Sequence, residues 1–228
     1  MVRYEHHMKH GGDDFMCGRY TVFTEDEIIE MRSIIAEVER IFGENSIKTG
    51  EIFPTNTAPV LIWEENRLAP KPVCWGYPRW NGGGAVINAR AETALDKTMF
   101  RKPLLTRRCV IPSTGFYEWK HVEGKKQKDR YLLREPKEKM LYMAGMINTF
   151  AHADGRRYDA FCVLTTAANE SVSPIHDRMP VILHPEEREA WLRDDTFMML
   201  VLARAGPALV LEQVVNRRST TSQNDAQS

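Results

Sequence analysis

Apolar side chains recur at helical spacing in one early stretch of the chain. Between residues 28 and 42 they fall three or four positions apart, as they do on one face of a helix. Just before them, residues 24–27 read Thr-Glu-Asp-Glu, which has the form of a capping box. The pattern predicts an amphipathic helix that packs on a core. Its apolar positions are Ile28, Met31, Ile35, Val38 and Phe42.

Most of the remaining chain carries short apolar runs broken by proline and glycine, a texture typical of β-strands and tight turns. The runs 141–150 and 159–166 flank Asp154-Gly155 and predict a hairpin. Residues 88–93 lead into a predicted short helix that ends near Phe100, and Pro185 opens another helix. The other predicted strands are 58–63, 72–75, 109–112, 115–119, 131–133 and 180–184.

Predicted strands outnumber predicted helices and lack the regular alternation with helices that a parallel sheet requires. We therefore expect an α+β fold, with a single domain around an antiparallel, barrel-like β-sheet and flanking helices. Polar segments at the two ends of the chain set its expected boundaries. These are a disordered leader or misassigned start at 1–15, the domain at 16–210 and a disordered tail at 211–228.

Composition narrows the functional classes. The 228 residues include 31 Lys and Arg and 31 Asp and Glu, so any basic site for nucleic acid must be local. The chain shows neither a secretory signal nor a run of about 18 apolar residues, which makes a cytoplasmic protein the expectation. Its four cysteines are widely spaced without a CxxC pair, which argues against a zinc site and a disulfide scaffold. We expect no metal and no organic cofactor.

The stretch Met16-Cys17-Gly18-Arg19-Tyr20 is the first candidate for chemistry. Methionine aminopeptidase removes a methionine that precedes a small residue, so a chain begun at Met16 would carry a free α-amine on Cys17. That amine (pKa about 7.7–8.0) and the thiol (about 8.5) would both react near neutral pH, and the Arg19 cation would favour the thiolate. Such a pair suits aldehydes, because the thiol can close a five-membered ring on the imine that the amine forms. The alternative is a small buried cysteine that opens a strand.

Two further residues could transfer protons. Glu118 lies between two aromatic residues of a predicted strand, and alternation places its side chain on the opposite face from theirs. On a solvent face Glu118 would have no special role, whereas in a cleft its pKa would rise and it could act as a base. His176 lies in a loop between two prolines, where it could transfer protons or form structural hydrogen bonds.

A basic segment begins near residue 90. Asn88 and Arg90 flank an alanine, so in extended backbone their side chains share one side, where they could hold a sugar and a phosphate. Alternatively they are a helix cap and a surface charge. Residues 90–108 contain six Lys and Arg against two Asp and Glu. This excess fits a solvated helix face or, with Trp75 and other aromatic residues nearby, a groove for single-stranded nucleic acid.

Taken in order, these segments resemble the SOS response-associated peptidase (SRAP) family over about residues 16–195. Each motif is short, but the ordered set is specific. The matching segments are 16–20 (MCGRY), 54–56 (PTN), 75–76 (WG), 88–93 (NARAET), 115–119 (GFYEW), 164–169 (LTTAAN) and 176–180 (HDRMP).

The resemblance implies a sensor of abasic sites in single-stranded DNA. Cys17, as the mature N-terminal residue, would trap the ring-opened sugar aldehyde as a thiazolidine, a stable crosslink that shields the lesion. The match implies that Asn88 positions the cysteine and the sugar, that Glu118 orients or deprotonates the α-amine, and that His176 assists proton transfer. An imine intermediate would also permit strand cleavage as a lyase side activity. The implied DNA-binding residues are Arg19, Trp75, Arg90 and Arg178.

Two alternatives stay open. An N-terminal-nucleophile thiol peptidase, including one that processes itself, would use Cys17, Glu118 and His176. A noncatalytic single-stranded DNA binding module would need none of them for chemistry. Residues 1–15 precede the cysteine and would block its α-amine, so crosslinking requires a start at Met16 or removal of the leader. We expect a monomer without a membrane partner that associates with the nucleoid when bound to damaged DNA.

Overall fold

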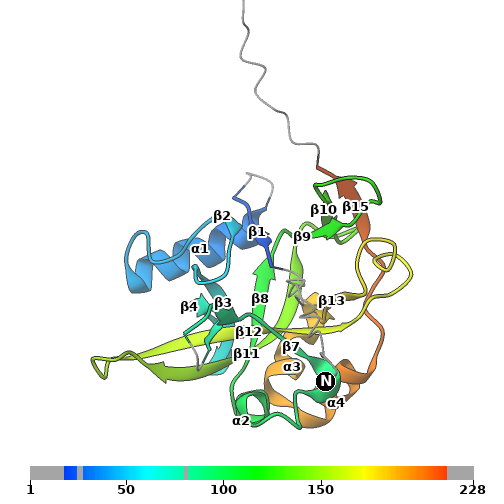
Figure 1. Cartoon of the computed structure of the whole chain (residues 1–228). Coiled ribbons are helices and arrows are strands. Elements are labelled where there is room, and N and C mark those ends of the chain that lie inside the picture. Colours follow the sequence, from blue (N-terminus) through cyan, green and yellow to red (C-terminus); the bar gives the residue numbers. More distant parts are fainter. Residues whose placement is uncertain (1–17, 25–27, 80–81, 215–228) are drawn as a thin grey trace, which may run out of the picture.

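A closed barrel of five strands forms the centre of the fold (Figure 1). The structure is a computed structural model, and it describes residues 18–24, 28–79 and 82–214. The barrel strands are β3 (Thr57–Glu64), β4 (Arg67–Trp75), β8 (Arg108–Ser113), β11 (Leu141–Ala151) and β12 (Arg157–Ala167). They follow in the order β12, β4, β3, β8 and β11, and the pairing of β11 with β12 closes the ring. The predicted α+β class and barrel-like sheet are confirmed.

A long hairpin joins β11 to β12, as the sequence predicts. Its register runs from Gly145 opposite Val163 to Ala151 opposite Arg157, and it extends to one side of the molecule (Figure 1). β12 also pairs in parallel with β4 and with β7 (Asn88–Arg90). The sheet is therefore mostly antiparallel, with two short parallel pairings that the sequence pattern did not indicate.

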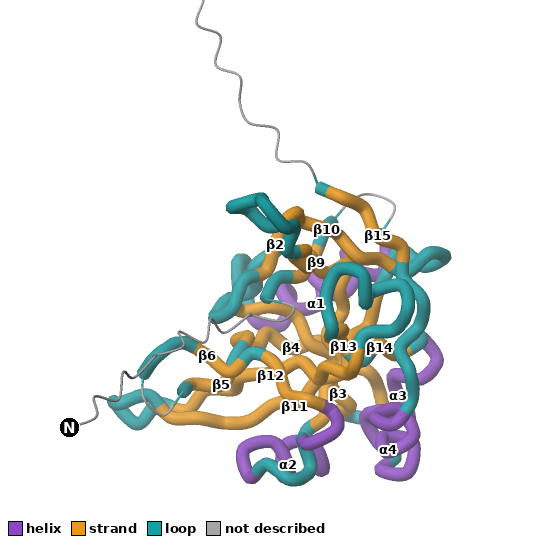
Figure 2. The backbone as a smooth tube through the Cα atoms, turned by 45° about the vertical axis from the view of Figure 1, so that its right-hand side comes forward, coloured by secondary structure: helices purple, strands orange, loops and turns teal. Residues whose placement is uncertain are grey.

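Shorter strands extend the barrel sheet and build a second sheet beside it (Figure 1, Figure 2). The second sheet consists, in order, of β15 (Val210–Gln213), β10 (Asp129–Arg134), β9 (Gly115–Lys120), β1 (Tyr20–Val22) and β2 (Gly50–Ile52). The remaining strands are β13 (Arg178–Pro180) and β14 (Ile182–Leu183) at the barrel sheet, and the pair β5 (Tyr77–Pro78) and β6 (Ala85–Val86).

Helices flank the sheets, as predicted. α1 (Ile29–Phe42) buries Met31, Ile35 and Val38, which confirms the amphipathic helix, although Phe42 is 45% exposed. Residues 25–27 of the predicted capping box lie outside the described residues. No helix in the described part of the chain has the length and apolar content needed to cross a membrane. The other helical segments are α2 (Thr98–Thr106), α3 (Arg188–Arg193), α4 (Asp195–Ala203) and the 3-10 turns η1 (Ala91–Thr93) and η2 (Pro185–Glu187).

Two predicted boundaries differ from the structure. Pairing with β12 keeps β7 extended, so the chain first turns through η1 and α2 then runs on to Thr106 instead of ending near Phe100. The tail predicted at 211–228 begins too early, because residues 211–213 belong to β15 and hydrogen-bond to β10. Residues 215–228 lie outside the described residues.

Gly145 allows β11 to lie close to both of its neighbouring strands in the barrel. It pairs with Cys109 of β8 on one side and with Val163 of β12 on the other. A β-carbon at this position would lie 2.4 Å from Ile111 Cδ1 and 2.8 Å from the carbonyl oxygen of Cys162. Because the carbonyl belongs to the backbone of a paired strand, it cannot move aside cheaply. The barrel therefore requires glycine here.

We expect Gly145→Ala to destabilise the fold by about 1–3 kcal/mol, the typical cost of overpacking a core. Urea unfolding followed by circular dichroism measures this change. Ala151→Val, at the exposed end of the same strand, is the control and should leave the unfolding midpoint nearly unchanged. An unaltered midpoint for Gly145→Ala would contradict the packing argument.

Candidate functional site

β1 places the beginning of the described chain against β9. The two strands pair in antiparallel register, with Tyr20 opposite Phe116. Continuing this register by two residues places Gly18 opposite Glu118. The preceding residue, Cys17, lies outside the described residues. The amide of Tyr117 donates to the carbonyl oxygen of Arg19 at 2.8 Å, so the chain before β1 continues along β9 toward Glu118.

Glu118 is 1% exposed, so its side chain does not lie on the solvent face of the strand. Alternation along β9 places it on the inner face with Phe116, while Tyr117 and Trp119 lie on the other face. Arg130 stacks on that other face, with its Cζ 3.6 Å from the centroid of the Tyr117 ring. A carboxylate is almost never fully buried unless it is paired, so Glu118 is not a surface charge, and its burial next to β1 makes it a functional candidate.

Buried hydroxyl groups fix β1 against β8 and β9. The Oγ1 atoms of Thr21 and Thr114 lie 2.8 Å apart, and Thr21 Oγ1 also donates to the carbonyl oxygen of Gly115 at 3.0 Å. Ser113 Oγ donates to the carbonyl oxygens of Thr21 and Gly115 at 3.1 and 2.7 Å. A slip of β1 along β9 would leave these buried groups without partners, which is costly. The network therefore stabilises the register described above.

The outer face of the same sheet carries arginine side chains on aromatic rings. Arg19 Cζ lies 4.2 Å from the centroid of Phe53 and 5.1 Å from that of Trp119. Glu51 accepts hydrogen bonds from Arg19 at 3.2 Å and from Arg130 at 2.5 Å. Stacking and ion pairing hold both guanidinium groups in place. Two arginines against one carboxylate leave a net positive charge near the end of β1, and the DNA-binding role of Arg19 stays a prediction.

A second group of predicted residues gathers along the C-terminal half of β12. Asn88 lies opposite Val163 and Arg90 lies opposite Thr165. Thr165 also pairs with Pro180 of β13. Asn88 is half-buried, whereas Arg90 is exposed. β12 therefore brings together the segments 88–93 and 176–180, which are far apart in the sequence.

Arg178 reaches from β13 to Glu92 in η1. Its Nη1 and Nη2 donate to the two carboxylate oxygens of Glu92 at 2.6 and 2.8 Å, and Nη2 also donates to the carbonyl oxygen of Thr165 at 2.7 Å. The hydrogen bonds from Arg178 lower the pKa of Glu92. The Arg178 side chain is only 11% exposed. Arg178 was predicted to bind DNA, but in this structure its guanidinium group is engaged by a carboxylate.

His176 lies in the predicted loop, two residues before β13. Its Nδ1 accepts a hydrogen bond from the backbone amide of Arg178 at 3.0 Å and lies 3.0 Å from the carboxylate of Asp177. In the neutral ring, Nδ1 accepts from the amide and the proton is therefore on Nε2. The side chain is 15% exposed. Nδ1 is thus occupied by its neighbours on the loop.

Trp75 links the two groups of residues. Its ring packs edge-on against Tyr20 of β1 at a centroid distance of 5.0 Å and stacks with Phe161 of β12 at 6.2 Å. Its Nε1 donates to the carbonyl oxygen of Ile87, next to Asn88, at 3.2 Å. The indole is 1% exposed. The prediction that Trp75 contacts DNA bases does not agree with this position, because the ring is a core element that supports the site strands.

The basic segment 90–108 is only partly a surface. Arg107 donates to both carboxylate oxygens of Asp159 at 3.2 and 2.8 Å. Arg108 is 4% exposed and forms an ion pair with Asp195 at 2.8 Å. Both guanidinium groups are thus engaged by carboxylates of the fold. The exposed cations of the segment are Arg90, Lys97, Arg101 and Lys102.

The cysteines that the structure describes are poor candidates for nucleophiles. Burial raises the pKa of the thiols of Cys74, Cys109 and Cys162. A raised pKa disfavours the thiolate, which is the reactive form. Cys17, outside the described residues, remains the candidate.

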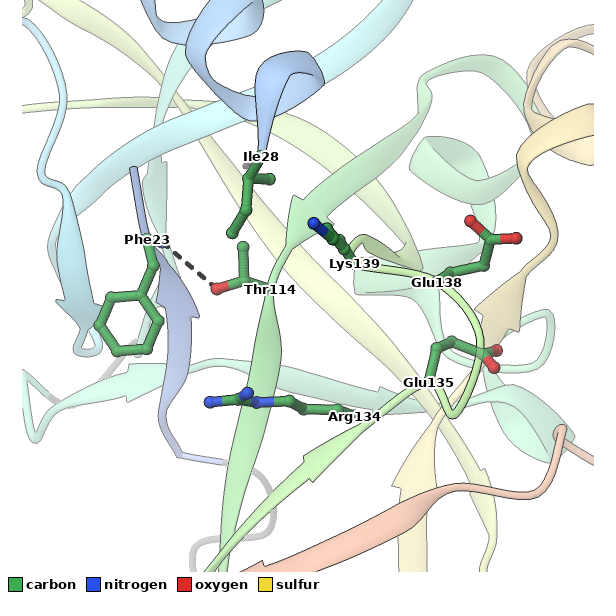
Figure 3. Close-up of a pocket in the computed structure, with 7 residues that line it drawn as sticks. All are labelled: Phe23, Ile28, Thr114, Arg134, Glu135, Glu138 and Lys139. Carbon is green, nitrogen blue, oxygen red and sulfur yellow. Dashed lines mark hydrogen bonds between the residues drawn. The ribbon is translucent and has the colours of Figure 1, made fainter. Parts of the chain in front are cut away.

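A pocket lies at the opposite end of β1 from Gly18 (Figure 3). There the amide of Phe23 donates to Thr114 Oγ1 at 3.3 Å. Burial raises the pKa of Glu135 on its rim. The lining residues are Phe23, Ile28, Thr114, Arg134, Glu135, Glu138 and Lys139. This pocket is separate from the candidate site, since the register places Glu118 at the other end of the strand.

Sequence reasoning assigned no role to Glu51, Arg130 or Glu92. Glu92 lies within the segment 88–93, so a cationic partner could have been sought for it in the segment 176–180. Glu51 and Arg130 lie outside the recognised segments and carried no signal.

Comparisons with known proteins bear on the family and the fold of this chain. The family model described as SOS response associated peptidase (SRAP) matches residues 16–216. The chain is 36% identical over 191 residues to the abasic site processing protein YoqW of Bacillus subtilis, covering 78% of this chain and 80% of that one. It is 29% identical over 182 residues to the abasic site processing protein YedK of Escherichia coli, covering 79% and 81%. A crystal structure of a protein from Bacteroides thetaiotaomicron shares the fold, with a TM-score of 0.71 and 23% identity, covering 88% of this chain and 93% of that one.

We expect Glu92→Gln to loosen the loop that carries His176, because a neutral amide cannot form the ion pair with Arg178. Hydrogen exchange measured by mass spectrometry should show lower protection factors at residues 176–178. Arg178 lowers the pKa of Glu92, so in the parent protein the ion pair is complete above the ordinary carboxyl pKa. It is lost as the pH falls through the lowered value of the folded state. The parent loop should therefore resemble that of the variant only at acidic pH.

Glu37→Gln is the matched control, since Glu37 forms an exposed ion pair with Arg67 at 2.8 Å. It should leave the protection of residues 176–178 unchanged. Equal protection in Glu92→Gln and the parent would show that the ion pair does not hold the loop.

Proposed function

Because the chain belongs to the SOS response associated peptidase (SRAP) family, we propose that it senses abasic sites in single-stranded DNA and traps them through Cys17. The names of its relatives, abasic site processing proteins, support this substrate. The product would be a crosslink that protects the lesion in the DNA damage (SOS) response. The protein would act as a monomer in the cytoplasm and associate with the nucleoid at damaged DNA.

The position of Glu118 carries the proposal. A carboxylate that is 1% exposed lies opposite Gly18 in the register of β1 and β9. An amine on Cys17, one residue away, would be within reach of this carboxylate. A positioned carboxylate in a low-dielectric environment is suited to accept the proton of an ammonium group. This supports an N-terminal amine as the reacting group.

The chemistry requires a free α-amine on Cys17. We propose that translation begins at Met16 and that this methionine is removed, or that the segment before Cys17 is cleaved. The start of the family match at residue 16 supports this. Residues 1–15 would then lie outside the working domain at 16–210.

The crosslink would form in two steps. The amine of Cys17 attacks C1′ of the open-chain aldehyde, and loss of water gives an imine. The thiol sulfur then adds to the same carbon, the electron pair of the C=N bond moves to nitrogen, and nitrogen takes up the thiol proton. The product is a five-membered thiazolidine. One water molecule is released, and nothing is oxidised or reduced.

The other predicted residues would assist these steps. Glu118 would deprotonate the amine, and His176 would move the proton that sugar ring opening and crosslink reversal require. Asn88 would hold the sugar and the cysteine through its amide. Arg19 and Arg90 would bind phosphates beside the lesion. Arg178 would act beside them, oriented by Glu92 and the carbonyl oxygen of Thr165.

The imine would also allow a lyase side activity. It acidifies C2′ of the sugar, so loss of a C2′ proton and departure of the 3′ phosphate by β-elimination would cleave the strand. The thiol closes the ring at C1′ and removes the imine. Strand cleavage would therefore compete with thiazolidine formation.

A thiol peptidase is the second candidate, and the description of the matching family favours it. Cys17 would attack a peptide bond, with Glu118 and His176 as proton-transfer groups, and the substrate could be the leader itself. Peptide cleavage needs no aldehyde. A noncatalytic DNA-binding module would in turn keep its activity without Cys17.

We expect protein begun at Cys17 to form a heat-stable crosslink with single-stranded DNA that contains one abasic site. Denaturing gels would show a shifted band, because a thiazolidine survives denaturation. Protein that retains residues 1–15 should give no band, since its Cys17 nitrogen is an amide. Cys17→Ala should also give none. A band from the blocked protein, or no band from either form, would refute the thiazolidine proposal.

Replacing Glu118 by Gln should slow crosslinking by about 10²–10⁴-fold, the usual contribution of a general base. The amide keeps the shape of the side chain, and circular dichroism checks that the fold is retained. Gel time courses at several pH values should show partial recovery at high pH, where solvent deprotonates the amine. Glu212→Gln, at an exposed residue of β15, is the control. Equal rates for Glu118→Gln and the parent at every pH would exclude the proposed role.

A further inference from the structure

The outer face of α2 lies outside the site described above and combines cations with hydroxyl groups. Five of its residues are spaced by three or four positions and so share one face of the helix. With Asp96, they line a shallow hollow of about 340 Å³. They are Thr98, Arg101, Lys102, Leu105 and Thr106.

The inner side of α2 is held firmly by the barrel. Pro103 and Leu104 are buried. The buried guanidinium group of Arg108 donates to the carbonyl oxygens of Leu104 at 3.0 Å and Leu105 at 3.4 Å, which satisfies the end of the helix. The outward side chains therefore project from a fixed support. A fixed support reduces the ordering cost of binding.

The charge of this region is positive, although the whole chain is neutral. Arg101 and Lys102 are exposed on the helix, and Lys97 is exposed just before it. Of the two nearby carboxylates, Glu92 is bound by Arg178, and Asp96 offsets only one of the cations. Arginine and lysine spaced along an exposed face are suited to phosphate groups.

The cations of α2 continue those of the proposed site. Arg90 is the last residue of β7, and η1 and one short turn lead from it directly to α2. Both Figure 1 and Figure 2 place α2 at one edge of the barrel, where it contacts β11 and β8. A strand of DNA whose phosphate is bound at Arg90 would therefore meet a second set of cations along the same segment of the chain.

We infer that the outer face of α2 binds the phosphates of the single strand that continues away from the lesion, and so extends the DNA contact beyond the reacting sugar. The inference rests on the proposed function. Leu105 and Met99 are 39% and 40% exposed among the cations, so the face also carries aliphatic side chains that unstacked bases can contact. A duplex hides its bases from such a surface. The composition of the face therefore favours a single strand.

The double variant Arg101→Gln with Lys102→Gln tests this. Fluorescence anisotropy would measure binding of undamaged single strands of about 5 and about 20 nucleotides, the first near the lower limit of single-strand sites and the second beyond the upper limit. The variant should bind the long strand roughly ten-fold more weakly and the short strand equally well. Its slope of log K against log salt on the long strand should fall by about 1.4, the value for two lost phosphate contacts.

Arg40→Gln with Lys48→Gln removes the same charge from the exposed end of α1 and the loop after it, and should not change binding. No loss on the long strand, an equal loss on both strands, or a larger loss on duplex DNA would overturn the inference. Undamaged DNA has no aldehyde, so the result does not depend on crosslinking. If the parent protein bound no single-stranded DNA, the proposed function itself would fail, whereas a parent that binds and a variant that binds equally would refute the α2 surface alone.

Discussion

The burial of Trp75 is the constraint on which the arrangement of the site depends. A single indole packs against β1 and β12 and donates to the carbonyl oxygen that precedes β7. Two hydrogen bonds hold the backbone of Trp75 to the turn at 54–56. The Thr55 amide donates to the Trp75 carbonyl oxygen at 2.8 Å, and the Trp75 amide donates to the Asn56 carbonyl oxygen at 2.9 Å. In a closely packed interior such a side chain cannot shift without its neighbours. The motif residues at 54–56 and 75 therefore act by fixing the relative positions of three strands.

The second sheet separates the charges of the site by its two faces. Glu118 points into the interior, while Arg19 and Arg130 lie on the outer face, where Glu51 binds both. Strand alternation alone produces this division, because neighbouring side chains point to opposite sides. The arginines can thus present positive charge near the end of β1 while a different carboxylate, Glu51, balances them. A buried acid and half-buried cations therefore lie within a few residues of one another.

Much of the fold could be predicted from local sequence. The apolar spacing of 28–42, the β11–β12 hairpin and the mostly antiparallel barrel all follow from periodicity and turn residues. The motifs also identified Asn88, Glu118 and His176, but not their surroundings. The burial of Trp75 and the engagement of Arg178 by Glu92 depend on which strands β12 brings together, and pairing partners far apart in sequence leave no local pattern. The same reason explains why Arg107 and Arg108 read as surface charge, although both are engaged by the fold.

β12 serves two purposes at once: it closes the barrel through β11, and its C-terminal half carries β7 and β13. A segment that belongs to the central sheet opens only when the whole domain unfolds, in contrast to a loop that opens by itself. The middle of β12 is therefore part of the global cooperative unit, and substitutions there change stability and site geometry together. Around β12, sequence change that alters the site without loss of stability is therefore confined to the short strands β7 and β13 that pair with it and to the turns beside them.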